Sequence, residues 1–321
     1  SDLADENTFV GADAGYRNTS GYDNTFIGSN AGAYNTSGYE NTFIGLAAGQ
    51  DTTTGIRNTF IGSISGAGNI KGNYNTYLGI WAGAWGTGGD RNTFLGGYTG
   101  IHNKGNRNTF LGYRAGYLNE GGAYNIFLGY ESGYRNQSGE FNMFLGYGAG
   151  GRNTIGSRNA YIGGYAGYYG TGATNNTFIG YGAGYHNETG DRNVCIGYNA
   201  GYNSTGSDRL YIDNSSTGTP LIYGRFDSDY VTINGKLGVG KNPVTHWIEV
   251  TGGAWCDGLV WHDVSSREHK ENIESLDAEE AMEALEGLRP VKFNYKRDKG
   301  DEYVGFIAED VPELVATKER K

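Results

Sequence analysis

The sequence predicts an all-β fold, a parallel β-solenoid or β-roll of thirteen coils, because one 17-residue unit recurs through the first two thirds of the chain. Gly supplies 57 of the 321 residues and follows this period rather than the three-residue period of collagen. Aromatic residues make up 14% of the chain, which is too much ring surface for a disordered tract. A unit of this length forms one coil, which buries its core only by stacking on its neighbours.

An Asn marks the start of each unit, and the step to the next is 17 residues, except for one step of 16 from Asn92 to Asn108. Numbered from this Asn, the consensus over positions 1 to 17 is N-T-F-[IL]-G-x-x-A-G-x-x-N-x-x-G-x-x. The missing residue falls between Asn103 and Gly105, in an expected turn. A degenerate thirteenth unit begins at Leu210. The marking residues are Asn7, Asn24, Asn41, Asn58, Asn75, Asn92, Asn108, Asn125, Asn142, Asn159, Asn176 and Asn193.

Positions 3 and 4 are both apolar in every unit, as in Phe26 and Ile27. Consecutive residues of a strand point to opposite faces. One face can therefore fill the narrow interior of the coil, while the other has to be covered by something else. No other part of the chain is large enough to cover it. We therefore expect the coils to pack against other copies of the same chain, which makes the protein an oligomer.

The polar and small positions of the unit predict turns and ladders. Gly at position 5 and the Ala-Gly pair at positions 8 and 9 indicate tight bends and close backbone approach. Asn at position 12, as in Asn18, Asn35 and Asn187, is expected to adopt a left-handed turn conformation. Asn at position 1 is expected to form an amide ladder in which each side chain bonds the next coil. At about 4.8 Å per coil, thirteen coils make a rod of roughly 60 Å.

Tyr residues gather around the Ala-Gly pair in the later units, and two interpretations stay open. One is a ladder of rings stacked coil on coil. The other is an exposed aromatic strip that binds glycan, because sugar rings pack on aromatic faces. Tyr147, Tyr165, Tyr168, Tyr198 and Tyr202 belong to this cluster. The candidate glycan contacts are Tyr113, Tyr117, Tyr130, Tyr134, Tyr181 and Tyr185.

Composition argues against several classes of partner. The net charge of −10 and the pI near 5.0 exclude the basic face of a nucleic-acid binder and adhesion to anionic membranes by charge. No apolar run approaches the ~18 residues of a membrane span, so no membrane insertion is expected. Cys195 and Cys256 are too few for a disulfide framework. His102 and His186 have no carboxylate or Cys in register, so no metal site is expected, and no cofactor.

Past the repeat, the sequence predicts two further parts. Residues 214–264 are expected to form a β-rich neck, intertwined in the oligomer, after a solenoid shaft at 1–213. Short strands are predicted over Leu221–Gly240, with Asn234-Gly235 as a two-residue hairpin turn, and another over Trp247–Val250.

The sequence of residues 265–321 predicts a small α+β domain. Asp277 is an N-cap with Glu280 three residues on, and it starts a helix that runs to Glu286 before Gly287 and Pro290. Strands are predicted over Val291–Lys296 and Tyr303–Ala308.

Three ordered blocks in this last segment carry a resemblance to a known family. They read S-S-R-E-H-K-E-N-I from Ser265, L-R-P-V-K-F from Leu288 and V-G-F-I-A-E-D-V from Val304. Together they resemble the intramolecular chaperone domain of endosialidase-type tailspikes. The N-T-F-I-G-x-x-A-G units resemble arrays upstream of such domains in phage tail fibres. They are also similar to the YadA-like trimeric β-roll heads of adhesins, whose coils are shorter, so the hand of the coil stays open.

The resemblance implies a homotrimer whose C-terminal domain registers three chains and then cuts itself off through a Ser-Lys dyad. By position, the nucleophile is Ser265 and its base is Lys270, and the cut falls between Ser265 and Ser266. A Ser hydroxyl needs a base to take its proton, and Lys serves only when burial or a nearby cation keeps it neutral. A pairing of Ser265 with His269 is the less favoured alternative. The chain ends at Lys321, sooner than such domains usually end, so a truncated copy is expected.

The leading functional hypothesis is a structural and receptor-binding trimeric tail fibre of phage type. It would be assembled in the bacterial cytoplasm and act on the virion tail or at an extracellular surface, binding a cell-surface glycan or receptor. Its chemistry would be at most one self-cleavage per chain. One alternative is a bacterial trimeric adhesin, which predicts a coiled-coil stalk and membrane anchor. Another is the non-catalytic part of a polysaccharide-depolymerising tailspike, which predicts paired carboxylates in a groove elsewhere.

Overall fold

A computed structural model describes residues 6–239, 248–250, 255–256, 261–262, 277–295 and 298–305. The chain divides into two compact units, residues 1–237 and 238–321, which we describe separately. In the described ranges, no helix is long and apolar enough to cross a membrane.

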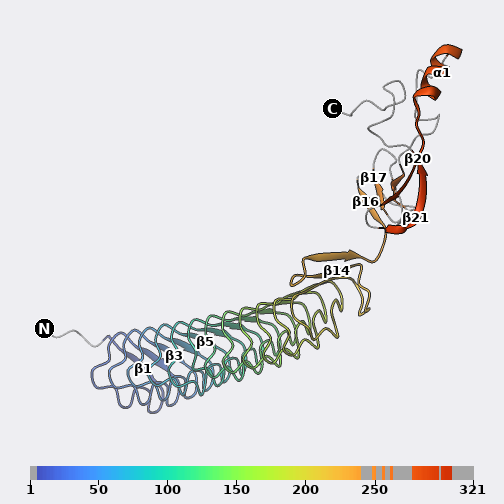
Figure 1. Cartoon of the computed structure of the whole chain (residues 1–321). Coiled ribbons are helices and arrows are strands. Elements are labelled where there is room, and N and C mark those ends of the chain that lie inside the picture. The colour runs from blue at the N-terminus through green and yellow to red at the C-terminus, as the bar shows by residue number, and fades with distance from the viewer. Residues whose placement is uncertain are drawn as a thin grey trace. The chain divides into compact units, whose positions relative to one another are not determined.

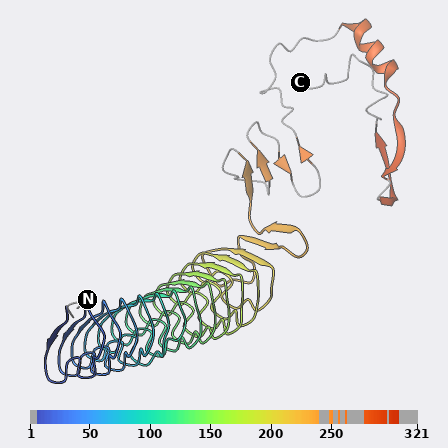
Figure 2. The same cartoon turned by 90° about the vertical axis from the view of Figure 1, so that its left-hand side faces the viewer.

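The first unit is the parallel β-solenoid that the repeat predicts (Figure 1). Each coil contributes one short strand, and equal positions pair in register, as in Phe26↔Phe43 and Ile27↔Ile44. Figure 2 shows the same coils, turned by 90°, following one another along a single axis. The thirteen parallel strands are β1 (Thr8–Val10), β2 (Thr25–Ile27), β3 (Thr42–Ile44), β4 (Thr59–Ile61), β5 (Thr76–Leu78), β6 (Thr93–Leu95), β7 (Thr109–Leu111), β8 (Ile126–Leu128), β9 (Met143–Leu145), β10 (Ala160–Ile162), β11 (Thr177–Ile179), β12 (Val194–Ile196) and β13 (Arg209–Ile212).

The core is a single stack of rings from position 3. Neighbouring centroids from Phe9 to Phe178 lie 4.6 to 4.9 Å apart, and their planes differ by 10° or less. Gly at position 9 closes the coil opposite the strand. A Cβ on Gly32 would lie 2.5 Å from Cε2 of Phe26, and Gly32 also has φ of +58°. Only Gly meets both conditions.

The predicted amide ladder at position 1 is confirmed. The backbone N–H of Asn41 donates to Oδ1 of Asn24 at 3.0 Å, and Nδ2 of Asn41 donates to the carbonyl oxygen of Gly55 at 2.8 Å. Asn58 repeats this pattern on Asn41. These buried amides satisfy backbone groups that the tight turns would otherwise leave unpaired.

The predicted left-handed conformation of Asn18, Asn35 and Asn187 at position 12 is wrong. Their φ angles are not positive, and the residues with positive φ lie mainly at positions 5, 7, 9 and 17. Position 12 forms a second amide ladder instead, in which Nδ2 of Asn35 donates to Oδ1 of Asn18 at 2.9 Å and to the carbonyl of Gly38 at 3.0 Å. The amide must point into the coil to reach both acceptors.

The short coil keeps both ladders. Nδ2 of Asn92 and Nδ2 of Asn103 both donate to the carbonyl oxygen of Gly105, at 3.0 and 2.8 Å. The backbone N–H of Asn108 still reaches Oδ1 of Asn92 at 2.9 Å. The missing residue is therefore absorbed between Asn103 and Gly105, as the sequence predicted.

An antiparallel hairpin extends the sheet beyond β13. It consists of β14 (Ile222–Arg225), which pairs with β13, and β15 (Tyr230–Ile233). The predicted hairpin turn at Asn234-Gly235 is wrong, because β15 and the next strand belong to different sheets. Asn234 instead donates from its backbone N–H to Leu221 at 2.9 Å and from Nδ2 to Pro220 at 2.7 Å, which prolongs the β14–β15 pairing.

The remaining described elements form two small sheets and a helix. One sheet contains β16 (Leu237–Val239), β17 (Ile248–Val250), β18 (Trp255–Cys256) and β19 (Trp261–His262). The other pairs β20 (Val291–Tyr295) with β21 (Asp298–Gly305). Helix α1 (Ala278–Gly287) begins at the predicted cap, where Oδ1 of Asp277 accepts from the N–H of Glu279 at 2.9 Å.

Candidate functional site

The outer face of the solenoid sheet carries a continuous apolar strip. Of the two apolar faces that the sequence predicted, position 3 points inward and position 4 outward, so Leu95 and Leu128 are 44% and 41% exposed while Phe94 and Phe127 are fully buried. At β8 and β9 the neighbouring position 2 is apolar too, in Ile126 and Met143. We call this surface the outer strip. It comprises Val10, Ile27, Ile61, Leu95, Leu111, Ile126, Leu128, Met143, Ile162 and Ile179.

The Tyr residues form two columns of rings, at positions 6 and 10, on either side of the Ala-Gly pair at positions 8 and 9. In the position-6 column, Tyr113, Tyr130 and Tyr147 stack at 5.5 and 5.1 Å. In the position-10 column, Tyr117 and Tyr134 stack at 5.2 Å, while Tyr168, Tyr185 and Tyr202 stack at 5.5 and 4.7 Å. The position-6 rings are also exposed. Stacking along the rod and exposure to solvent thus coexist, and the glycan role of the named Tyr residues stays a prediction.

Two phenols on this side of the coil, Tyr130 of the position-6 column and Tyr165 at position 7, have raised pKa values. The carboxylate of Glu131 raises the pKa of Tyr130, and burial adds to the effect. A hydrogen bond with Tyr147, together with burial, raises the pKa of Tyr165 to about 12. The hydroxyl groups of Tyr130 and Tyr165 therefore remain uncharged donors and acceptors at neutral pH.

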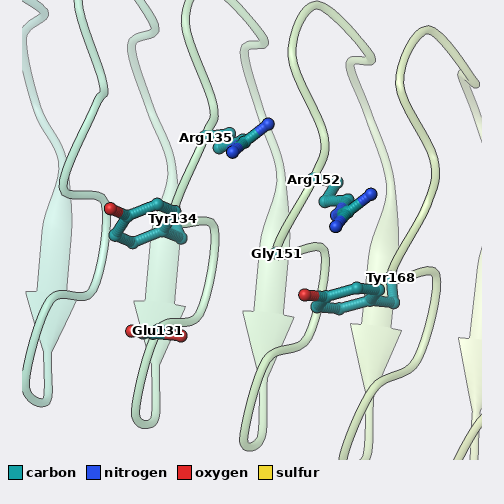
Figure 3. Close-up of a pocket in the computed structure, with 6 residues that line it drawn as sticks. All are labelled: Glu131, Tyr134, Arg135, Gly151, Arg152 and Tyr168. Atoms are coloured by element: carbon teal, nitrogen blue, oxygen red, sulfur yellow. The ribbon is translucent and has the colours of Figure 1, made fainter.

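The position-10 column is interrupted at Gly151. The gap is a cavity of about 110 Å³ lined by Glu131, Tyr134, Arg135, Gly151, Arg152 and Tyr168. Figure 3 shows the Tyr134 and Tyr168 rings on either side of the Gly151 coil, with Arg135 and Arg152 on one side of the gap and Glu131 on the other. We call this cavity the Gly151 slot.

No cluster of three His, Cys, Asp or Glu side chains suited to a metal ion occurs within the part of the chain that the structure describes. His102 and His186 take part in aromatic contacts instead. Their ring centroids lie 5.3 Å from Trp85 and 5.1 Å from Tyr169, respectively.

The predicted catalytic pair, Ser265 and Lys270, and the predicted cut between Ser265 and Ser266 lie outside the described residues. The same holds for His269. Their roles therefore stay predictions that rest on the sequence blocks.

Comparison with known proteins addresses this segment directly. Residues 265–318 match the family model described as chaperone of endosialidase. No curated protein and no solved structure was found to match the chain. The chain thus joins a chaperone-of-endosialidase domain to a parallel β-solenoid, a combination that suggests a protein like a phage tail fibre or tailspike.

Proposed function

We propose that this chain is a structural and receptor-binding fibre of phage type, whose C-terminal domain drives trimerisation and is then removed by autoproteolysis. The observation that carries the proposal is the chaperone-of-endosialidase match at residues 265–318 in the same chain as the solenoid. Domains of this family take part in trimer assembly. The site of action is accordingly the virion tail or an extracellular surface, where the fibre meets a glycan or receptor.

The outer strip supports the trimeric state. Its side chains are more than a third exposed in a single chain, and they are distributed along the sheet from β1 to β11. A contiguous apolar surface of this extent favours burial against a partner. Two further copies of the chain supply equal strips with the same spacing from coil to coil, which fits a closed symmetric assembly.

Autoproteolysis is assigned to Ser265 and Lys270. In the proposed step, neutral Lys270 takes the proton of the Ser265 hydroxyl, whose oxygen adds to the carbonyl carbon of the Ser265–Ser266 peptide bond. The C–N bond breaks, the amino group of Ser266 leaves with the proton held by Lys270, and water then hydrolyses the ester that has formed. The Lys side chain is a base only after its pKa is lowered by burial or a nearby cation. Burial on trimerisation would provide this, and it would link cutting to completed assembly.

The test is the intact and native mass of the full chain in three forms, wild type, Ser265→Ala and Lys270→Arg. We expect the wild type to form a trimer of chains that end near Ser265. Both variants should stay uncut, because Arg keeps the positive charge of Lys270 but cannot act as a base at neutral pH. A wild type that stays whole, or a Lys270→Arg chain cut as fast as the wild type, would overturn the dyad. A monomeric wild type would overturn the trimeric fibre.

A further inference from the structure

The Gly151 slot has the size of one missing ring. Tyr occupies position 10 in the two coils before Gly151 and in the three coils after it, and adjacent Tyr rings are 4.7 to 5.5 Å apart. Tyr134 and Tyr168 are separated by two coil spacings, which is roughly 10 Å. A ring placed at a packing distance of about 3.5–4.0 Å from each face needs roughly 7–8 Å. The gap therefore admits one ring, including the extra thickness of a puckered sugar ring.

The slot keeps its opening because Gly151 provides no side chain. Tyr168 leans toward the vacant place, so a Cβ on Gly151 would lie 2.8 Å from its Cε2. Tyr168 is held on its other face by Tyr185 at 5.5 Å. The two walls of the slot are thus aromatic faces, one of which can move with a side-chain rotation.

Two guanidinium groups flank the opening. Arg135 and Arg152 occupy position 11 of consecutive coils and are both exposed. Arg152 lies over the rings of Tyr168 and Tyr169, with Cζ 5.6 and 4.6 Å from their centroids. Neither Arg forms an ion pair with a carboxylate of the described residues. In a chain of net charge −10, this pair is a local concentration of positive charge.

Glu131 on the other side of the slot is already paired. Its Oε1 accepts a hydrogen bond from Nη1 of Arg114 at 3.3 Å. The remaining lone pairs of this carboxylate can accept hydrogen bonds from hydroxyl groups. The slot therefore combines two aromatic faces with two Arg side chains on one side, which have no carboxylate partner among the described residues. On its other side lies a carboxylate that can accept hydrogen bonds from hydroxyl groups.

We propose that the Gly151 slot binds one sugar ring that carries a carboxylate, a uronate unit of an acidic polysaccharide. The ring packs between Tyr134 and Tyr168, its carboxylate is held by Arg135 and Arg152, and Glu131 accepts from its hydroxyl groups. Arg binds a carboxylate with two parallel hydrogen bonds, which gives both strength and orientation. This inference rests on the receptor-binding part of the proposed function and names the class of its ligand.

The slot lies on the wall of the coil opposite the outer strip. Gly150, at position 9 next to the slot, meets the ring of Phe144 from across the core, since a Cβ on Gly150 would lie 2.4 Å from Cε2 of Phe144. Phe144 belongs to β9, whose other face contributes Met143 to the outer strip. A trimer built on the outer strip therefore leaves the slot open to solvent.

The test is binding of methyl β-glucuronide and of its neutral match, methyl β-glucoside, to the full chain, measured by ligand-observed NMR titration. Gly151→Tyr supplies the missing ring of the column and fills the slot. Gly97→Tyr is the matched control, because position 6 holds Tyr in the next three coils and lies in the other column. Arg152→Gln removes one cation and keeps the length of the side chain.

We expect glucuronide to bind the wild type and Gly97→Tyr equally, and to bind Gly151→Tyr and Arg152→Gln about tenfold more weakly or not at all. Glucoside should bind weakly to the wild type and be insensitive to Arg152→Gln. Equal binding of glucuronide to Gly151→Tyr and the wild type would overturn the slot, as would equal affinity for the two sugars or no binding at all. Trimer mass and cleavage near Ser265, measured on the same samples, report on the fibre function separately.

Discussion

In two coils inside the core stack, Tyr replaces Phe and a second residue changes with it. The two coils with Tyr77 and Tyr161 at position 3 carry Gly86 and Gly170 at position 12, while most Phe coils carry Asn there. A Cβ on Gly170 would lie 3.1 Å from the hydroxyl oxygen of Tyr161. This hydroxyl is buried, and burial holds the pKa of Tyr161 far above its usual range. The phenol thus occupies the space that the amide of the second ladder fills elsewhere.

A double-mutant cycle checks this exchange. Gly170→Asn should lower the free energy of unfolding by about 2 kcal/mol, because the amide and the phenol compete for one space. Tyr161→Phe alone should be neutral or stabilising by about 1 kcal/mol, since it removes a buried hydroxyl without a hydrogen-bond partner. The double variant should recover the wild-type midpoint of urea unfolding. Purely additive effects of the two changes would contradict the exchange.

At this scale the sequence predicted much of the core. One apolar face inside the coil and the amide ladder at position 1 followed from strand alternation and from a repeated Asn. Strand alternation alone did not decide which of positions 3 and 4 points inward. The second ladder at position 12 was missed, because a lone Asn in a turn is equally typical of a left-handed φ. Its true role depends on acceptors one coil away, such as Oδ1 of Asn18 for Asn35. The shared replacement of Phe by Tyr and Asn by Gly was the signal that could have found it.

The turns of each coil rely on left-handed residues, and not all of these are Gly. Position 7 has φ of 58° to 61° in side chains as different as Asn30, Trp81 and Ile64. Asn tolerates this region, whereas a β-branched residue is strained in it. Ile64 has φ of 61° and still donates its N–H to Leu46 at 2.7 Å. The ladder bonds of the coil hold it in an unfavourable conformation.

We expect that relieving this backbone strain stabilises the solenoid. Ile64→Asn should raise the free energy of unfolding by about 1 kcal/mol, and Asn30→Ile, the reverse change at the same position of another coil, should lower it by a similar amount. Chemical denaturation followed by circular dichroism measures both. If both variants moved the midpoint in the same direction, backbone strain would not be the cause.

Elements outside the repeat were harder to predict. Asn234-Gly235 has the composition of a two-residue hairpin turn, but the pairing partners of Asn234 are Pro220 and Leu221, which local sequence does not reveal. The cap of helix α1 at Asp277 was predicted because its signal is local. The same contrast explains the Gly151 slot, which arises from a break in a column of rings and requires the coils to be stacked before it can be seen.

For the whole molecule, the outer strip is the feature that a trimer would bury. It is widest at β8 and β9, where Ile126, Leu128 and Met143 all face outward. Burial of such side chains contributes about 25 cal/mol per Å² of apolar area. A carboxylate placed in that interface would lose its hydration without gaining a partner.

The double variant Leu128→Glu, Met143→Glu should therefore sediment as a monomer at concentrations where the wild type is a trimer. Ile155→Glu, which changes an exposed side chain away from the strip, serves as the control and should stay trimeric. Sedimentation velocity separates the two states. If the double variant still sedimented as a trimer, the trimer interface would lie elsewhere.

The register of the solenoid also determines how a fibre of this kind carries load. Hydrogen bonds between coils run parallel to the long axis of the stack, from Thr8 to Asn24 and so on to Arg209. A pull along that axis would stretch them in series, so that coils peel away one at a time from an end. Each released coil of 17 residues adds roughly 55–60 Å of extended chain. A single solenoid is thus a weak tether that lengthens under tension. Three solenoids packed side by side along their outer strips would share the force and resist peeling.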